Sequence, residues 1–531
     1  MGESGEVLNG NARKFAASSA AFFARSKTLQ RAVLCPHETG ISYRAPGRLL
    51  SFHNRHSLRL RNWCSARQAE PTHARSRWWP KIIRRAVSQG DTEMRYPQNA
   101  VFKLRMIAIA SVVAFALGGA AQSVGRQHCL AGCGDCGSSV QAVLPGCSGC
   151  LACRSVLTGD WHGCRSSLAG HGITFQGDVT QYYQGVTSGG REQSFEYGGH
   201  ADYVLNVDLS KLGAWQGLFL KVRGESQFGR FVNRETGAIL PANNEGLPPT
   251  PGEQETALTN FVFTQFLSQR TAVFAGKLDT LDGDMNAFAH GRGKNQFMNA
   301  ALVVNPVVFR TVPYSTYGAG LLLLDKQEPI FSLMVLDPVD HATEGPTDLF
   351  AEGVTLAAEL RLPTTFLGLP GHQLIGGTWS SRDVPDLTRL LVPPGTTVPT
   401  ASDSWSLYWN FDQYLVVDPC DESRGWGVFG RVGVADDDSN PLDWFLSFGV
   451  GGSSPIACRT ADTFGVGWYY APISDSLPGP LLGDHGQGVE LYYNYAATPW
   501  LHITPDLQII DPARRGIDTA LVFGIRVKMD L

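Results

Sequence analysis

Charged residues and long apolar runs are both scarce in this sequence. Asp, Glu, Lys and Arg make up 17% of the 531 residues, well below the roughly one quarter typical of soluble proteins. Beyond residue 121, no apolar run reaches the roughly 18 residues that a transmembrane helix needs. We therefore expect no such helix there, and a membrane role would have to come from strands.

Motifs of the common enzyme classes are also missing from the sequence. The histidines form no His-Glu-x-x-His pair, and the chain has neither a Gly-x-Ser-x-Gly elbow nor a phosphate-binding loop. Carboxylate pairs such as Asp282 and Asp284 lie in turn-like sequence. We therefore predict that the chain is not an enzyme and needs no cofactor.

Glycine and aromatic residues, by contrast, are abundant. The chain has 59 glycines, and aromatic residues make up 10% of it. Glycine is common in turns, and aromatic residues are enriched in strands. This composition indicates many short strands joined by turns rather than a helical protein.

Charge is distributed unevenly along the chain. Residues 1–93 hold 16 Lys and Arg against 6 Asp and Glu, whereas residues 94–531 hold 28 against 42. A basic arm could bind nucleic acid, but this stretch has no helix or strand periodicity and precedes a second candidate start at Met94. We interpret residues 1–93 as a non-native or disordered upstream extension and predict no nucleic-acid partner.

Residues 94–121 have the layout of a secretory signal peptide. Basic residues precede an apolar run from Met106 to Leu117, and the small residues Gly119-Ala120-Ala121 follow as a cleavage site. The run is too short for a typical transmembrane helix. We therefore predict that the rest of the chain is exported into an oxidising compartment.

Residues 122–156 form a cysteine-rich segment. Cys133 and Cys136 form one Cys-x-x-Cys pair, and Cys147 and Cys150 form another. Such pairs can hold zinc or an iron–sulfur cluster as thiolates. Disulfides are favoured in an oxidising compartment, so a metal site at these four cysteines is the less favoured alternative.

From residue 157 onward, apolar residues alternate with polar or small ones, which is the period of a strand. The last segment is the clearest: Leu521, Phe523 and Ile525 share one face, and Arg526 and Lys528 share the other. Segments 217–226, 425–434, 443–452 and 463–472 show the same alternation. Strands of about ten residues suit a tilted strand that crosses a bilayer. Residues 233–255, rich in proline, glycine and asparagine, and residues 391–403 are predicted as long external loops between such strands.

The charges on the second face favour a membrane barrel over a soluble sandwich. Every backbone N–H and C=O group in lipid needs a partner, and a closed barrel supplies all of them. Charged side chains such as Lys221, Arg223 and Glu225 would be costly in a dry core, but a water-filled lumen accommodates them. A soluble sandwich with polar outer faces remains the alternative.

Four short motifs follow one another along residues 157–531. Leu157-Thr-Gly-Asp-Trp-His-Gly-Cys-Arg165 opens the region, Gly427-Val-Phe-Gly-Arg-Val-Gly433 and Arg459-Thr-Ala-Asp-Thr-Phe-Gly-Val-Gly467 come late, and Thr498-Pro-Trp500 follows. By their order and spacing the chain resembles the OprB-type carbohydrate-selective porin family. Within the opening motif, His162 replaces the usual glycine and Cys164 a usual leucine. Two departures are the terminal Leu531, where the family usually has an aromatic residue, and the cysteine-rich segment, which is not a general family feature.

The resemblance implies an all-β fold, a transmembrane antiparallel barrel of sixteen strands in the outer membrane, spanning residues 157–531. It implies passive diffusion of small sugars, with outer-membrane lipid and the barrel assembly machinery as further partners. The alternatives are a general or other-solute porin and a non-conducting barrel for adhesion or scaffolding. The resemblance fixes no oligomeric state.

A sugar pore needs polar groups that replace water on hydroxyls, and aromatic faces for the sugar ring. Arg292 and Lys294, in the sequence HGRGKNQ, are predicted on a loop that folds inward. Strand alternation gives the remaining pore-lining candidates: Phe219, Lys221, Arg223, Glu225, Lys277, Asp279, Phe429, Arg431, Arg526 and Lys528. For each of them, the alternative is a structural charge or packing ring in the wall.

Overall fold

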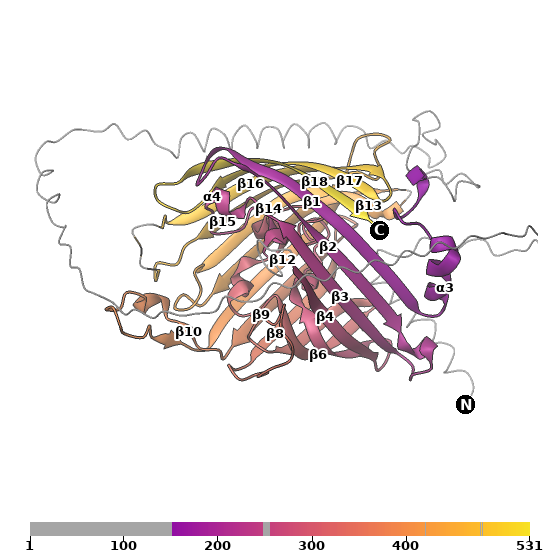
Figure 1. Cartoon of the computed structure of the whole chain (residues 1–531), viewed down its shortest axis with the longest axis horizontal. Coiled ribbons are helices and arrows are strands. Elements are labelled where there is room, and N and C mark those ends of the chain that lie inside the picture. Colours follow the sequence, from indigo (N-terminus) through magenta and orange to yellow (C-terminus); the bar gives the residue numbers. More distant parts are fainter. Residues whose placement is uncertain (1–150, 248–254, 420, 478, 480–481) are drawn as a thin grey trace, which may run out of the picture. The chain divides into compact units, whose positions relative to one another are not determined.

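The fold is a closed antiparallel barrel of sixteen strands (Figure 1), as the resemblance implied. The computed structural model describes residues 151–247, 255–419, 421–477, 479 and 482–531. Strand β1 pairs with both β2 and β18, which closes the barrel. The strands of the barrel are β1 (Ile173–Gly190), β2 (Phe195–Asp208), β3 (Leu218–Gly229), β4 (Glu255–Phe266), β5 (Thr271–Asp279), β6 (Ser315–Asp325), β7 (Glu328–Leu336), β8 (Thr355–Phe366), β9 (Leu369–Ser380), β12 (Ser404–Asp418), β13 (Asp421–Ala435), β14 (Trp444–Ser453), β15 (Thr463–Pro472), β16 (His485–Thr498), β17 (Leu501–Asp511) and β18 (Asp518–Asp530).

The remaining described elements are short and lie in the connections. A separate two-stranded sheet consists of β10 (Val384–Pro385) and β11 (Thr400–Ala401). The helices are η1 (Leu151–Cys153), η2 (Trp161–Gly163), α3 (Cys164–Gly170), η3 (Leu209–Leu212), α4 (Asn233–Thr236), η4 (Asn244–Gly246), η5 (Thr280–Gly283), α5 (Ala300–Val303), η6 (Pro306–Arg310) and η7 (Leu387–Arg389). Across the described ranges, a search for helices of membrane-spanning length and apolarity finds none.

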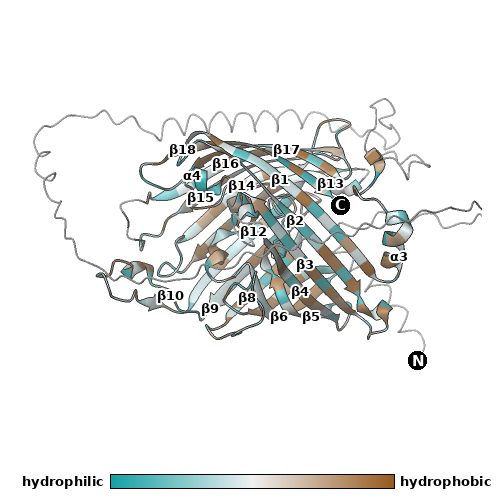
Figure 2. Cartoon of the chain, in the orientation of Figure 1, coloured by the Kyte–Doolittle hydropathy of each residue, from teal (hydrophilic) through white to brown (hydrophobic). Residues whose placement is uncertain are grey.

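The alternation predicted from the sequence decides which face of each strand is exposed. On β18, Leu521, Phe523 and Ile525 are exposed, whereas Ala520 and Val522 are fully buried. Figure 2 shows hydrophobic and hydrophilic residues alternating along the visible strands. The apolar side chains therefore face outward, as a lipid-exposed barrel requires.

The segment before β1 is hydrogen-bonded to the last residues of the chain. Arg165 of α3 donates hydrogen bonds through Nη2 to the carbonyl oxygen of Leu531 at 2.8 Å and to that of Phe175 at 3.4 Å. The backbone N–H of Leu157 donates to the carbonyl oxygen of Asp530. The arginine of the opening motif thus holds Leu531, the residue that follows β18, against the start of β1.

Two long loops lie inside the barrel. The β5–β6 loop (residues 280–314), called the inserted loop below, contacts side chains of β1, β3, β13, β16 and β18. Since β13 and β16 lie across the ring from β5 and β6, a loop that starts at β5 and touches them must cross the lumen. The described part of the β3–β4 loop, residues 230–247, lies against the inserted loop, because Asn244 donates to the carbonyl oxygen of Arg292.

An external β3–β4 loop was expected from its proline, glycine and asparagine content, and for its described part this expectation is wrong. Asn243, Asn244 and Glu245 are fully buried. Such a composition indicates irregular backbone, but it does not indicate on which side of a barrel that backbone lies.

A hydrophobic core fills part of the lumen. Phe297 of the inserted loop packs against Phe429 of β13 and Tyr492 of β16, with ring centroids 5.3 and 4.9 Å apart. Inward-facing glycines leave space for this packing. A Cβ added at Gly467, for example, would lie 2.9 Å from the side chain of Leu302. Small residues on this wall therefore allow the inserted loop to approach the strands closely.

Several predictions concern residues outside the described ranges. These are the upstream extension (1–93), the signal peptide (94–121) and most of the cysteine-rich segment (122–156), including Cys133, Cys136, Cys147 and Cys150. Further along the chain, Cys458 is disulfide-bonded.

Candidate pore site

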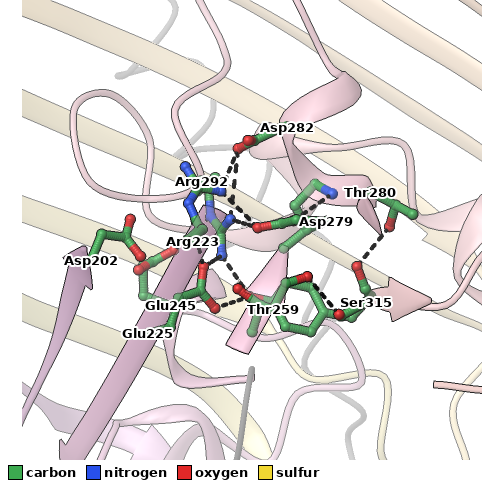
Figure 3. Close-up of polar contacts among 12 residues, drawn as sticks. Asp202, Arg223, Glu225, Glu245, Thr259, Asp279, Thr280, Asp282, Arg292 and Ser315 are labelled. Atoms are coloured by element: carbon green, nitrogen blue, oxygen red, sulfur yellow. Dashed lines mark hydrogen bonds and ion pairs between the residues drawn. The ribbon is translucent and has the colours of Figure 1, made fainter. Parts of the chain in front are cut away.

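Eleven charged or titratable side chains meet on one inner wall of the barrel. Figure 3 labels Asp202, Arg223, Glu225, Glu245, Asp279, Asp282 and Arg292 among them. Strands β1, β2, β3 and β5 supply some of them, and the two inserted connections supply the others. Successive inward positions of β3 carry Lys221, Arg223 and Glu225, because every second residue of a strand points to the same side. We call the set the lumenal cluster; its members are Asp178, His200, Asp202, Lys221, Arg223, Glu225, Glu245, Asp279, Asp282, Arg292 and Lys294.

Arg223 is the link between the wall and η5. Its Nη1 lies 2.7 Å from both Oδ2 of Asp279 and Oδ1 of Asp282. Lys221 reaches the same η5 carboxylate, with Nζ 2.6 Å from Oδ2 of Asp282. The side chains of Lys221 and Asp282 are both 27% exposed, and that of Arg223 is 11% exposed. These three groups therefore present polar atoms that a solute could contact.

The cations of the inserted loop bind the deeper carboxylates. Arg292 pairs with Asp279 and, through Nη2, with Oε1 of Glu225 at 2.8 Å. Lys294 pairs with Asp202 and lies 3.1 Å from Oδ1 of Asp178. Both cations are almost fully buried. Because burial makes an unpaired charge costly, these pairs fix the loop at this place.

Glu245 joins the β3–β4 loop to the cluster. Its Oε2 lies 2.6 Å from Nδ1 of His200 and 3.7 Å from Nζ of Lys294. Burial alone would raise the pKa of the Glu245 carboxyl, but His200 and Lys294 outweigh burial and lower that pKa to about 2. The glutamate therefore stays ionised at every physiological pH.

The cluster could be considered as a metal site, because His200, Asp202 and Glu225 bring ligand atoms within 4.8 Å of one another. Two of these carboxylates, however, already bind cations of the protein: Lys294 pairs with Asp202, and Arg292 pairs with Glu225. A metal ion would have to displace these cations, so this donor set does not favour a metal. A second acidic group, Asp436–Asp438, lies on the β13–β14 turn, where solvated carboxylates are common.

Six of the twelve predicted pore-lining residues, those from β3, β5 and the inserted loop, come together in the cluster. They are Lys221, Arg223, Glu225, Asp279, Arg292 and Lys294.

Three further candidates lie elsewhere on the wall. Lys277 donates to the carbonyl oxygens of Ala342 and Glu344 in the β7–β8 loop. Phe219 packs edge-on against Phe266, and Lys528 pairs with Asp530 near the end of the chain.

The remaining candidates, Phe429, Arg431 and Arg526, are covered by the inserted loop. The first two have no exposed surface, and Arg526 has almost none. They face inward, as the alternation predicts, but in this structure they contact protein atoms rather than open lumen.

Sequence reasoning missed five members of the cluster: Asp178, His200, Asp202, Glu245 and Asp282, the last of which was placed in turn-like sequence. His200 and Asp202 alternate with outward-facing residues such as Tyr203, which is the signal that identified β3. The neighbouring Gly198 and Gly199 weaken that alternation. Glu245 had no periodic signal, because it lies in an irregular loop.

Comparisons with known proteins agree with the barrel and its motifs. A sequence model of the family described as "Carbohydrate-selective porin, OprB family" matches residues 192–531. Porin B of Pseudomonas aeruginosa is 30% identical over 129 residues, which cover 20% of this chain and 28% of that protein. The match thus spans little more than a quarter of this curated relative.

The high pH structure of Pseudomonas putida OprB superposes with a TM-score of 0.63 and 20% identity, over 71% of this chain and 99% of that one. At this identity the likeness concerns the fold alone, and the family model supplies the relationship. The chain belongs to the OprB family of carbohydrate-selective porins and is a β-barrel of the outer membrane.

Proposed function

We propose that this chain is a passive channel through which small sugars cross the outer membrane, and that the lumenal cluster lines its narrow part. The single observation that carries the proposal is the arrangement of Lys221, Arg223 and Asp282. They place donors and acceptors side by side, partly exposed, on the inner wall. Sugar hydroxyls, which both donate and accept hydrogen bonds, match such a surface.

The pairing of the charges favours neutral polar solutes. Each of these exposed charges lies within 3 Å of an opposite charge, so little net field is left to retain an ion. Unused hydrogen-bonding positions on the ammonium, guanidinium and carboxylate groups remain available to a hydroxyl. Binding to such groups is weak, which a channel needs if its solute is to leave again.

The outer face and the last strand suggest the other partners. Exposed Phe523, Ile525 and Leu521 on β18 supply an apolar surface for outer-membrane lipid. We also propose recognition of β18 by the barrel assembly machinery, with the terminal Leu531 in the place of the family's aromatic residue.

The test is the swelling of liposomes that contain the purified protein, followed by light scattering. Mono-, di- and trisaccharides are compared with a sugar acid and with a neutral amino acid of similar mass to a monosaccharide. We expect the monosaccharide to enter faster than both matched solutes, with rates that fall as the sugar lengthens. Equal rates for solutes of equal mass would indicate a general porin instead.

A non-conducting barrel is the other outcome, and it has its own structural support. The aromatic core formed by Phe297, Phe429 and Tyr492 occupies part of the lumen. An absence of swelling with every solute, from protein that migrates as a folded barrel in unheated gels, would support adhesion or scaffolding and contradict the channel.

A further inference from the structure

Several buried ionisable side chains of the wall lie outside the lumenal cluster, among them three that bind the inserted loop. Arg431 of β13, Glu490 of β16 and Arg526 of β18 have almost no exposed surface. All three bind the backbone of the inserted loop, and Arg431 also pairs with the side chain of Asp284 in that loop. Contacts to backbone determine where a segment lies regardless of which side chains it carries.

Arg431 holds the inserted loop at two places. Its Nη1 donates to the carbonyl oxygen of Leu302 at 3.0 Å, and its Nη2 donates to that of Val303 at 3.1 Å. The same guanidinium donates to the carbonyl oxygen of Ala289 and lies 2.8 Å from Oδ2 of Asp284. One guanidinium thus joins the beginning of the segment to α5, which its five donors allow.

Glu490 and Arg526 hold the part between these two places. The oxygens of Glu490 accept hydrogen bonds from the backbone N–H groups of Met298 and Asn299, at 2.6 and 2.8 Å. Nη1 of Arg526 donates to the carbonyl oxygens of Gly293 and Gln296, both at 2.7 Å. Glu490 thus accepts from backbone donors and Arg526 donates to backbone acceptors, so both side chains are matched by backbone groups of the loop.

The anchored positions bracket the two cations that the loop contributes to the lumenal cluster. Arg292 and Lys294 lie between the contacts of Arg431 at Ala289 and those of Arg526 at Gly293 and Gln296. A shift of this backbone by a single residue would move both cations away from Glu225 and Asp202. The anchors therefore lie on β13, β16 and β18, strands that contribute no residue to the lumenal cluster, but they would control its composition.

The strands themselves do not depend on these side chains. Arg431 is paired with Ser447, Glu490 with Gln508 and Arg526 with Thr504 in the backbone register of the sheet. These pairings use main-chain groups, so the barrel can stay closed when an anchor is lost. The expected consequence of losing an anchor is therefore release of the loop rather than unfolding of the wall.

We propose that Arg431, Glu490 and Arg526 are positioning residues that hold Arg292 and Lys294 in the lumenal cluster, and that they thereby determine which solutes the channel selects. The selectivity part of this inference rests on the proposed function; the positioning part does not.

The test uses the full-length protein, folded in detergent, with Arg431→Met, Glu490→Met and the milder Arg431→Lys. Arg361→Met is the matched control, because Arg361 is a wall arginine of β8 whose ion pair is with Glu328, outside the inserted loop. Trypsin cleavage after Arg292 and Lys294, identified by mass spectrometry, reports release of the loop. Migration in unheated gels reports whether the barrel is folded.

We expect cleavage at these two positions to rise roughly tenfold to a hundredfold in the Met variants, since each hydrogen bond to a charged group contributes about 1.5–3 kcal/mol. Arg431→Lys should give an intermediate value, because the ammonium keeps the charge but loses the fork of donors. Swelling assays on the same variants should show a smaller preference for sugars over matched charged solutes.

Wild-type cleavage and wild-type selectivity in folded Met variants would overturn the proposal, and so would equal cleavage in Arg361→Met. If Met variants do not fold, Arg431→Lys carries the test with the same two readouts. If the wild-type channel passes no sugar but cleavage still follows the anchors, the positioning role stands and the proposed function fails.

Discussion

The two sides of the lumen share the same strand alternation, but their inward-facing side chains differ in chemistry and in role. On β2 and β3, inward positions carry charged residues such as Asp202 and Arg223, some of which remain partly exposed. On β13 and β16, inward positions carry rings such as Phe429 and Tyr492, which are completely covered. The charged side can contact solutes, whereas the aromatic side packs against the inserted loop.

The inserted loop is built to match this difference. Its Phe297 and Leu302 face the aromatic side, and its Arg292 and Lys294 face the charged side. Apolar packing on the aromatic side therefore holds the backbone of the inserted loop in place. That backbone in turn holds Arg292 and Lys294 against the charged side. Disturbing either side should have separable effects on stability and on permeation.

The largest expected effect on stability is on the aromatic side. Phe429→Ala removes a fully buried ring that packs against Phe297, and we expect a loss of about 3–5 kcal/mol in the free energy of unfolding. Denaturant unfolding in detergent, followed by tryptophan fluorescence, measures it. Phe448→Ala, at an outward position of the neighbouring strand, is the control. Equal losses in both variants would show that the two faces are not distinguished by the loop.

A smaller effect on stability, but a larger one on permeation, is expected on the charged side. Asp279→Asn weakens the pairing of Arg223 and Arg292 at once, which should cost about 1.5–3 kcal/mol. The freed guanidinium groups should also make the channel more favourable to anions, measured as a shift in reversal potential across a salt gradient. An unchanged reversal potential, with conductance as in the wild type, would remove Asp279 from the solute path.

The sequence predicted which face of a strand points inward, but not what covers that face. Lys221, Arg223 and Glu225 were found from alternation, and so were Phe429 and Arg431. Nothing in the alternation separates Lys221 and Arg223, which are partly open to the lumen, from Phe429 and Arg431, which are buried under a loop. That difference depends on contacts between residues more than a hundred positions apart, such as Arg431 and Leu302.

Irregular loops were the other limit of sequence-based prediction. The sequence HGRGKNQ indicated a loop that folds inward, and the structure places Arg292 and Lys294 there against the wall. The β3–β4 loop, which carries Glu245, was expected outside because its composition resembles that of a solvated turn. Inside the barrel, its polar side chains contact His200 and the inserted loop, and these partners cannot be read from local composition.

The smallest expected effect concerns pH, and it tests whether the two loops are held on the charged side by Glu245. The groups that face this carboxyl are His200, Lys294 and Arg292, and its pKa in the folded protein is about 2, below the ordinary 4.5. A carboxyl with a lowered pKa stabilises the fold above its ordinary pKa, and that contribution disappears as the pH falls towards the folded value.

Single-channel current noise should therefore stay constant from neutral pH down to about 5 and rise only below about 4.5, as the loops loosen. Glu245→Gln should remove this acid transition and give noisier currents at every pH. A transition near neutral pH would contradict the assignment and point to His200 as the group that controls the loops.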